Sequence, residues 1–316
     1  MKRGLVEWDE QEVPRATLDA RVARVRAWGR EHGFDALLFH TSDSHAQPVR
    51  YLTHFLLYWN EGVLVLPCGE DAEAVVVYGL SGRVLDWVRR TSTLTQAVTA
   101  RDVGGAVALL LGDRAYQRVG IVEPDIFPAP TLARIAPSGP IDASDVLSVL
   151  GLDEAERVLR RTAERLTRQA FASVSPDLSQ WQAAAAFHGS ARLAGAEDVS
   201  LLVGEPPAWP GLPGAGRLPH GAYLLGRVEY KGAWHQAART LGLPTPPGWF
   251  AELAASVRPG IRVGDLPVLR VEELSGPAPF RQLAAEATLR PGAVLAVTAV
   301  RDSVLWGETL SLPGSG

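Results

Sequence analysis

Val228–Leu243 reads VEYKGAWHQAARTLGL, and this stretch decides how the second half of the chain is interpreted. Only one of its residues, Glu229, is acidic. Side chains alternate between the two faces of a strand, so a strand through Gln236 divides its neighbours into two sets. One face carries Trp234, Gln236 and Ala238, and the other carries His235 and Arg239. A regular strand earlier in the chain likewise places Leu225, Arg227 and Glu229 on one face.

The composition sets limits on the class of protein. The chain has 316 residues, 47% of them hydrophobic, which suggests two domains that each have a sizeable core. Its 31 basic and 35 acidic residues give a net charge of -4, so nothing favours a nucleic acid or an anionic membrane as partner. The start, MKRGLVEWDE, lacks the apolar core of a signal peptide, and no apolar run approaches the ~18 residues of a membrane span. We therefore expect a cytoplasmic protein.

The first half alternates between helix and strand patterns, which indicates an α/β domain. A helix is predicted from Leu18 to Gly33, followed by a buried strand at 35–39. Further elements are strands at 63–66, 74–78 and 118–122 and helices near 84–90 and 106–111. The apolar FLLYW at 55–59 is interpreted as a buried strand, with a subunit contact as the alternative. This domain is expected to span residues 1–150.

The second half, 151–316, begins with patterns for two long helices. Asp153 and Glu156 have the spacing of a helix start, and apolar residues follow at helical spacing. This predicted buried stripe consists of Val158, Leu159, Ala163, Leu166 and Ala170. Ser179 and Gln182 fit a capping box, and Gly195 fits the end of the second helix. A Pro- and Gly-rich connection at 204–221 interrupts the strand-rich remainder.

Several segments match one known family in the same order along the chain. They are FDALLF, RYLTHF and GVLVLP in the first half, and DEAERVLRRTAERLTRQAFASV, YKGAWHQAARTLGL, LRPGAVLAV and GETLSL in the second. Together they resemble the creatinase, aminopeptidase P and prolidase family over nearly the whole chain. The resemblance implies a creatinase/prolidase-type α/β domain over 1–150. It also implies a shortened α+β pita-bread domain over 151–316 with a curved, mostly antiparallel sheet, and a homodimer.

The resemblance further implies where metal ligands would stand. The metallopeptidases of this family hold two divalent ions with two Asp, one His and two Glu, and a bridging water is the nucleophile. The pattern places Gln236 at the second Asp, and Leu225 at the first, or Arg227 after a shift of two residues. Thr298 and Gly307 fall near the two Glu positions.

Two other residue types complete this comparison. Glu308 lies one position beyond the last Glu, which sends its side chain to the opposite face of a strand. All seven histidines lie at or before His235, so the family's late His has no candidate. The resemblance therefore implies that the dimetal site of the family is missing, and we expect no metal.

A second chemistry of the family needs no metal. Creatinase-like members hydrolyse a C–N bond with a His as proton shuttle and with carboxylates that hold the substrate. We identify His220 and Glu229 as candidate catalytic residues, because imidazole transfers protons near neutral pH. His235 and Glu308 are further residues of these types. The alternatives are a solvated turn for His220, and for Glu229 a structural ion pair with Arg227 or a solvated strand face.

The candidate binding residues are Arg227, Trp234 and Gln236 in the second half, and His45 and Arg50 in the first. Trp234 and Trp209 suggest an aromatic platform for a ligand, although core packing is the commoner use of such rings. His45 and Arg50 lie in FHTSDSHAQPVRYLTHF, which the resemblance places near a partner subunit's pocket. The His and Asp residues there match no standard zinc spacing.

These observations predict a pita-bread homologue that has lost the metal site and serves as a binding or regulatory protein for a small-molecule or peptide ligand. The alternative is a hydrolase of C–N bonds, either metal-independent and creatinase-like or an Xaa-Pro aminopeptidase or dipeptidase. No glycine-rich phosphate loop or dinucleotide fingerprint occurs, so no cofactor is expected. The lone Cys68 is interpreted as a packed thiol.

Overall fold

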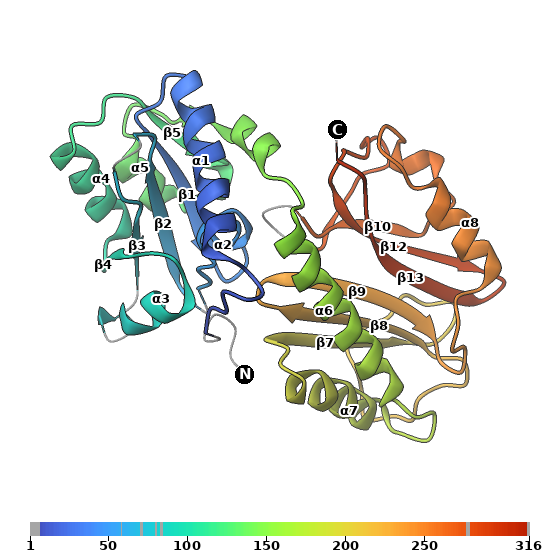
Figure 1. The fold of residues 1–316 in the computed structure, drawn as a ribbon. Helices are drawn as coiled ribbons and strands as arrows, with labels where there is room; N and C mark the ends of the chain where they lie inside the picture. Colours follow the sequence, from blue (N-terminus) through green and yellow to red (C-terminus); the bar gives the residue numbers. More distant parts are fainter. Residues whose placement is uncertain are drawn as a thin grey trace. The chain divides into compact units, whose positions relative to one another are not determined.

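A computed structural model describes residues 7–57, 59–69, 72–79, 81–82, 85–275 and 279–314. The chain divides into two compact units between Gly151 and Leu152. Figure 1 draws the N-terminal unit in blue to green and the C-terminal unit in green to red. No helix of the described residues has the length and apolar character needed to cross a membrane.

The N-terminal unit is built on a six-stranded mixed sheet in the order β4-β3-β2-β1-β5-β6. Its strands are β1 (Ala36–Ser42), β2 (Glu61–Pro67), β3 (Val75–Tyr78), β4 (Gln96–Thr99), β5 (Val119–Val122) and β6 (Ile141–Asp142). β2 pairs antiparallel with β1 and β3, and the remaining pairs are parallel. The predicted α/β class is confirmed.

Helices cover both faces of this sheet. They are α1 (Arg15–Glu31), α2 (Gln47–Thr53), α3 (Leu85–Thr91), α4 (Val103–Asp113) and α5 (Ala129–Ile135), with 3-10 turns η2 (Pro124–Ile126) and η3 (Ser144–Val149). Leu37 packs with Val25 of α1, whereas Leu38 packs with Val107 of α4. Because neighbouring strand residues point to opposite faces, α1 and α4 lie on opposite sides of the sheet (Figure 1).

Two details of this unit differ from or refine the sequence interpretation. The buried strand expected at 55–59 is wrong, because Phe55 to Leu57 are buried without strand pairing and Trp59 is exposed. The left-handed His54, at φ 63°, ends α2 and redirects the chain, so apolar burial here occurs without a sheet ladder. Tyr58, and Val84 at the expected start of a helix, lie outside the described residues.

Cys68 is buried, and burial raises its thiol pKa to about 11, as expected of a packed thiol.

The C-terminal unit is built on a seven-stranded sheet in the order β11-β10-β12-β13-β9-β8-β7. The strands are β7 (Asp198–Gly204), β8 (Tyr223–Tyr230), β9 (Ala233–Thr240), β10 (Arg270–Glu273), β11 (Arg281–Gln282), β12 (Val294–Arg301) and β13 (Val304–Ser311). Every neighbouring pair is antiparallel. The curved antiparallel sheet of the expected pita-bread fold is confirmed.

Three helices accompany this sheet, namely α6 (Glu154–Ala172), α7 (Gln180–Leu193) and α8 (Gly248–Ser256), with a 3-10 turn η4 (Val263–Asp265). The Asp153 carboxylate accepts a hydrogen bond from the Glu156 amide at 3.0 Å, which starts α6. Ser179 and Gln182 form the predicted capping box of α7. The predicted α6 stripe is buried except for Val158, which is half-buried. Local chemistry therefore fixes where both long helices begin.

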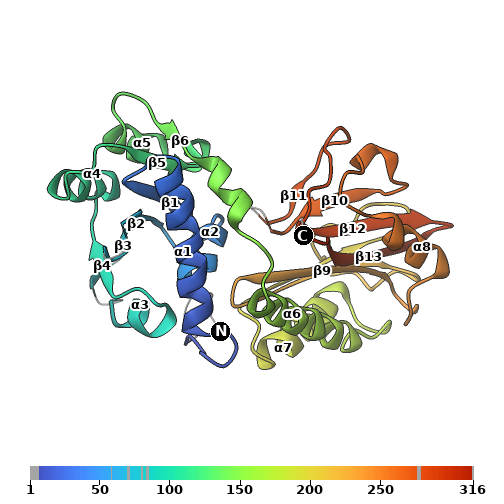
Figure 2. The same ribbon diagram turned by 45° about the horizontal axis from the view of Figure 1, so that its top comes forward.

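One face of the C-terminal sheet packs against helices, and we call it the helix face. It carries Gly226, His235 and Glu308 and lies against α6 and α7, which Figure 2 shows on one side of the sheet. A Cβ at Gly226 would lie 2.5 Å from Phe187 Cζ and 2.8 Å from Phe171 Cζ. The helices can approach β8 this closely only because position 226 has no side chain. The opposite face is therefore the surface of this sheet that α6 and α7 leave uncovered.

Candidate functional site

The register of β8 and β9 places the candidate residues of these two strands on one face. Arg227 lies opposite Gln236, and Glu229 lies opposite Trp234. Directly opposed residues of an antiparallel pair point to the same face. The predicted sharing of faces is confirmed, and we call this surface, with Arg227, Gln236 and Glu272, the arginine face.

Three side chains form a closed polar network on the arginine face. Arg227 Nε donates to Gln236 Oε1 at 2.6 Å, and Arg227 Nη2 donates to Glu272 Oε1 at 3.1 Å. Gln236 Nε2 donates to Glu272 Oε2 at 2.8 Å. Glu272 has no exposed surface and Gln236 is 1% exposed, so the network is built into the unit. Both oxygens of the carboxylate are occupied by donors.

A second guanidinium reaches the same carboxylate. Arg270 Nη2 lies 3.0 Å from Glu272 Oε1, so two arginines share one buried acid. Burial lowers the pKa of Arg227, while the charge of Glu272 raises it. An arginine keeps its proton in proteins, and these three groups therefore carry a net charge of +1.

Aromatic rings flank both guanidinium groups. The Arg227 guanidinium carbon lies 4.0 Å from the centroid of Phe280, and that of Arg270 lies 5.2 Å from the centroid of Trp209. Trp234 meets Phe280 edge-on at 4.9 Å. The predicted aromatic platform of Trp234 and Trp209 is therefore divided, since Trp234 packs on Phe280 and Trp209 on Arg270.

Glu229 does not take the expected partner. The ion pair of Arg227 is made with Glu272 across the sheet, and Glu229 is fully buried on the same face opposite Trp234. Arg227 instead donates from Nε to Gln236 and from Nη2 to Glu272. The structural ion pair predicted for these two residues is wrong.

The positions that the resemblance equates with metal ligands lie close together but lack ligand groups. Leu225, Ala238, Gly307 and Thr298 are opposed in turn across β8, β9, β13 and β12, and Gln236 lies on the same face. A Cβ at Gly307 would lie 2.7 Å from Thr298 Oγ1, so this position is closed to a longer side chain in the present packing.

The donor set does not fit a pair of divalent ions. Hard cations bind carboxylate oxygens, and the equivalent side chains here are a hydrocarbon, an amide, a hydroxyl and a hydrogen. The nearby Glu272 carboxylate already accepts from Gln236 and Arg227. Across 7–57, 59–69, 72–79, 81–82, 85–275 and 279–314, no three His, Cys, Asp or Glu residues are grouped so as to hold a metal.

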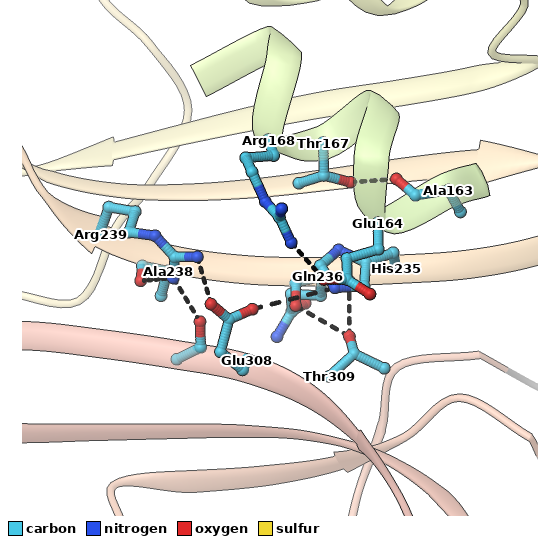
Figure 3. A network of polar contacts seen from close by, with 11 residues as sticks. Ala163, Glu164, Thr167, Arg168, His235, Gln236, Ala238, Arg239, Glu308 and Thr309 are labelled. Carbon is cyan, nitrogen blue, oxygen red and sulfur yellow. Dashed lines mark hydrogen bonds and ion pairs between the residues drawn. The ribbon is translucent and has the colours of Figure 1, made fainter. Parts of the chain in front are cut away.

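The helix face carries a separate charge network, drawn in Figure 3 beneath α6. Arg239 is paired with Glu308 and also donates from Nη1 to the Gly307 carbonyl at 2.7 Å. His235 Nε2 lies 3.9 Å from Glu308 Oε2. Glu308 thus points away from the arginine face, as predicted from its position in the strand.

His235 is held neutral by its surroundings. Burial, together with the charges of Arg239, Arg168 and Arg160, lowers its pKa from 6.5 to about 3. Burial also raises the pKa of Glu308, against the opposing effect of Arg239. His235 is 6% exposed, and the folded protein is more stable with this imidazole neutral than with it protonated.

This pKa shift predicts that acid destabilises the fold. Between pH 6.5 and about 3 the unfolded chain binds a proton at His235 and the folded chain does not. The contribution of His235 to the free energy of unfolding is fully present above pH 6.5. It falls as the pH is lowered, by up to ~1.4 kcal/mol per pH unit. The raised pKa of Glu308 acts in the opposite direction above 4.5 and partly offsets the fall there.

The measurement is urea unfolding of His235→Gln and wild type between pH 3.5 and 6.5. We expect the variant to lose less stability on acidification, with the largest difference from wild type below pH 4.5. The control is His220→Gln, which changes an exposed histidine. Equal pH dependence of wild type and His235→Gln would contradict this explanation.

The remaining candidates lie elsewhere. His220 is exposed on the turn that precedes β8, and Tyr223 at the start of that strand is already ~13 Å along the backbone from Arg227. In the N-terminal unit, Arg50 is 2% exposed and donates to Gln47 Oε1 at 2.7 Å. His45 Nδ1 lies 3.2 Å from Ser44 Oγ, and burial lowers the pKa of this imidazole.

A cavity of about 610 Å³ lies in the N-terminal unit, between α4, α5 and the β5–β6 edge of the sheet. Its lining is mostly apolar, with Leu111, Tyr116 and Ile141 among the residues. Arg134 is the charged residue of this lining. The cavity therefore lacks the paired acid and base groups that catalysis requires.

Sequence reasoning missed Glu272, Arg270 and Phe280. The segment RVEEL offered a signal, because two adjacent Glu residues in a strand point to opposite faces. Glu273 indeed lies on the other face, where Arg281 and Arg290 each approach it to 2.6 Å. One of the two acids therefore had to face Arg227 once β10 joined the sheet.

Comparisons with known proteins agree with this fold. No family model and no curated protein matches the sequence. Among solved structures, the prolidase from Pyrococcus horikoshii OT3 superposes with a TM-score of 0.68 at 13% identity, covering 94% of this chain and 96% of that one. The Xaa-Pro dipeptidase from Bacillus anthracis gives 0.65 at 14% identity, with 94% and 95% covered.

A third similar structure is the N-terminal domain of the FACT complex subunit SPT16 from chickpea, with a TM-score of 0.58, 13% identity and 94% of each chain covered. At these identities the likeness concerns the fold. The chain therefore has the pita-bread fold of prolidases, Xaa-Pro dipeptidases and X-Pro aminopeptidases over almost its whole length.

Proposed function

We propose that this protein is a pita-bread homologue without metallopeptidase activity that serves as a binding or regulatory protein. One observation carries the proposal. The Arg227 guanidinium lies where the resemblance expects metal ligands and bonds at once to Gln236 and Glu272. A fixed cation thus occupies the region in which divalent cations would have to be held.

Electrostatics supports the proposal. Two like charges repel strongly in a partly buried setting, where the effective dielectric constant is far below that of water. Arg227 and Arg270 together exceed the charge of Glu272. A second carboxylate, Glu229, faces the same surface but is fully buried and has interactions of its own. Binding two divalent ions here would require several carboxylates that the arginine face lacks.

The fold itself is compatible with such a role. The chickpea protein of the same fold is described as a subunit of a complex, whereas the archaeal and bacterial proteins are described as a prolidase and a dipeptidase. One fold supports different functions because function resides in the residues of the site. The arginine face therefore has more weight than the fold in this proposal.

A second candidate is a metal-independent hydrolase of C–N bonds. The observation in its favour is the His235 and Glu308 pair, which combines a proton carrier with a carboxylate. This pair lies beneath α6, and His235 is 6% exposed. A substrate would have to displace the helix to reach it, so we favour the binding role. The homodimer and the cytoplasmic location stay predictions.

Hydrolysis of an Xaa-Pro dipeptide tests the proposed function. We expect no turnover above the uncatalysed rate, with or without added manganese. Gln236→Asp should also be inactive, because one restored carboxylate leaves Leu225, Thr298 and Gly307 without ligand groups. Manganese-dependent turnover by the wild type that disappears in Gln236→Ala would contradict the proposal.

A further inference from the structure

We propose that the arginine face binds a small carboxylate monoanion that carries an apolar or aromatic group. This inference rests on the proposed function, since it assigns a ligand class to the surface that the metal site would otherwise occupy. The binding groups are the edges of Arg227 and Arg270, with the rings of Phe280, Trp209 and Trp234 beside them.

The charge of the surface favours an anion. Glu272 is the shared partner of both guanidinium groups, and its second oxygen accepts from Gln236. Its capacity is therefore used, and one positive charge of the trio stays uncompensated. A partly buried excess charge is stabilised by a counter-ion that reaches it directly.

Both arginines have N–H groups that the network does not use. Arg227 uses Nε and Nη2 in the network, and its Nη1 has no hydrogen-bond partner in the part of the chain that the structure describes. The buried Nε of Arg270 likewise has none. The Arg227 and Arg270 side chains are 21% and 29% exposed. A ligand can therefore reach the exposed parts of both guanidinium groups, whereas the Arg270 Nε atom itself is buried.

The arrangement is also rigid. Gln236 and Glu272 fix the plane of the Arg227 guanidinium, and Phe280 covers one of its faces. A planar fork held in this way suits a carboxylate, whose two oxygens accept parallel hydrogen bonds. Because the donors are already ordered, binding loses little conformational entropy.

The aromatic rings favour an apolar group on the ligand. Phe280 and Trp234 meet edge-on, and Trp209 lies over Arg270. Trp234 is 7% exposed, and its buried Nε1–H finds no acceptor among the described residues. A buried indole N–H normally has a partner, so a ligand oxygen would complete this donor.

The net charge distinguishes a carboxylate from a phosphate. The trio of Arg227, Arg270 and Glu272 has one positive charge in excess, which balances one negative charge, while Glu229 on the same face has interactions of its own. A phosphate dianion would carry a second charge into a partly dry surface without a matching cation. We therefore expect a carboxylate to bind more tightly than inorganic phosphate.

The test is a ligand-observed NMR titration with phenylacetate, phenylacetamide and inorganic phosphate. We expect saturable binding of phenylacetate, and binding of the neutral phenylacetamide and of phosphate that is at least about ten-fold weaker. Arg227→Gln and Arg270→Gln should each weaken phenylacetate binding about ten-fold or more. The matched control is Arg258→Gln, which changes an exposed arginine of the same unit and should leave binding unchanged.

Two outcomes would overturn the inference. One is no saturable binding of phenylacetate, or equal binding of phenylacetate and phenylacetamide. The other is an affinity for phenylacetate that is unchanged in both Arg227→Lys and Arg270→Gln. Arg227→Lys keeps the charge but removes the planar fork, and circular dichroism checks that both variants fold. If the protein is metal-free and inactive but binds no carboxylate, the ligand class is wrong and the proposed function stands. If it hydrolyses an Xaa-Pro dipeptide with manganese, the proposed function fails.

Discussion

Glu272→Ala is expected to lower the free energy of unfolding of the C-terminal unit by about 3–5 kcal/mol. The wild-type carboxylate is fully buried and accepts from Arg227 and Gln236, with Arg270 also in contact. Its removal leaves a partly buried guanidinium and a buried amide without their acceptor. Uncompensated groups of this kind account for the largest effects of single substitutions.

The measurement is hydrogen exchange of peptides from β8, β9 and β10 as a function of urea, which reports on this unit separately. The matched control is Glu286→Ala, which removes an exposed carboxylate of the same unit and should change stability by less than ~0.5 kcal/mol. The double variant Arg227→Met with Glu272→Leu should lose less stability than Glu272→Ala, since the Arg227 charge is removed with its partner and only Arg270 keeps a charge without its acceptor. Equal effects of Glu272→Ala and Glu286→Ala would show that the network contributes little.

Phe187→Ala is expected to destabilise the same unit by about 3–5 kcal/mol, because it opens a cavity in the core. The Phe187 ring has no exposed surface and meets Phe171 edge-on at 5.0 Å between centroids. It lies directly over Gly226 of β8. The contact therefore joins α6 and α7 to the sheet that carries the arginine face.

Coupling with Gly226 sharpens this test. Gly226→Ala alone should destabilise, since the new Cβ would lie 2.5 Å from Phe187 Cζ. In the Gly226→Ala, Phe187→Ala double variant the clash with Phe187 is gone and only the contact with Phe171 Cζ is left, so the total loss should be smaller than the sum of the two single losses. Leu193→Ala on α7 is the control, because this side chain is 92% exposed. Strict additivity of the two losses would contradict the packing described for Gly226.

The features that were predicted from sequence are those that depend on neighbouring residues. The capping residues Asp153 and Ser179 act on amides three positions away, so their spacing alone reveals them. Sharing of faces by Trp234 and Gln236 follows from the alternation of a strand, and the register confirms it. The same rule predicts that the Glu308 side chain lies on the opposite face of the sheet from position 307.

The features that were missed depend on residues far apart in the sequence. Arg227 and Glu272 are separated by 45 positions. In the sheet, β12, β13 and β9 lie between β10, which carries Glu272, and β8, which carries Arg227. No local pattern states which strand joins the sheet at which register. The interpretation of 55–59 was wrong for a related reason, because an apolar run shows burial but not the pairing that makes a strand.

The central claim is that Arg227, Gln236 and Glu272 occupy the region where related folds would need metal ligands. Elemental analysis of the protein purified in the presence of manganese tests this claim most directly, with Gln236→Ala as the paired variant. We predict no stoichiometric manganese, zinc or cobalt in either protein. At least one equivalent of tightly held metal in the wild type, lost in Gln236→Ala, would contradict it.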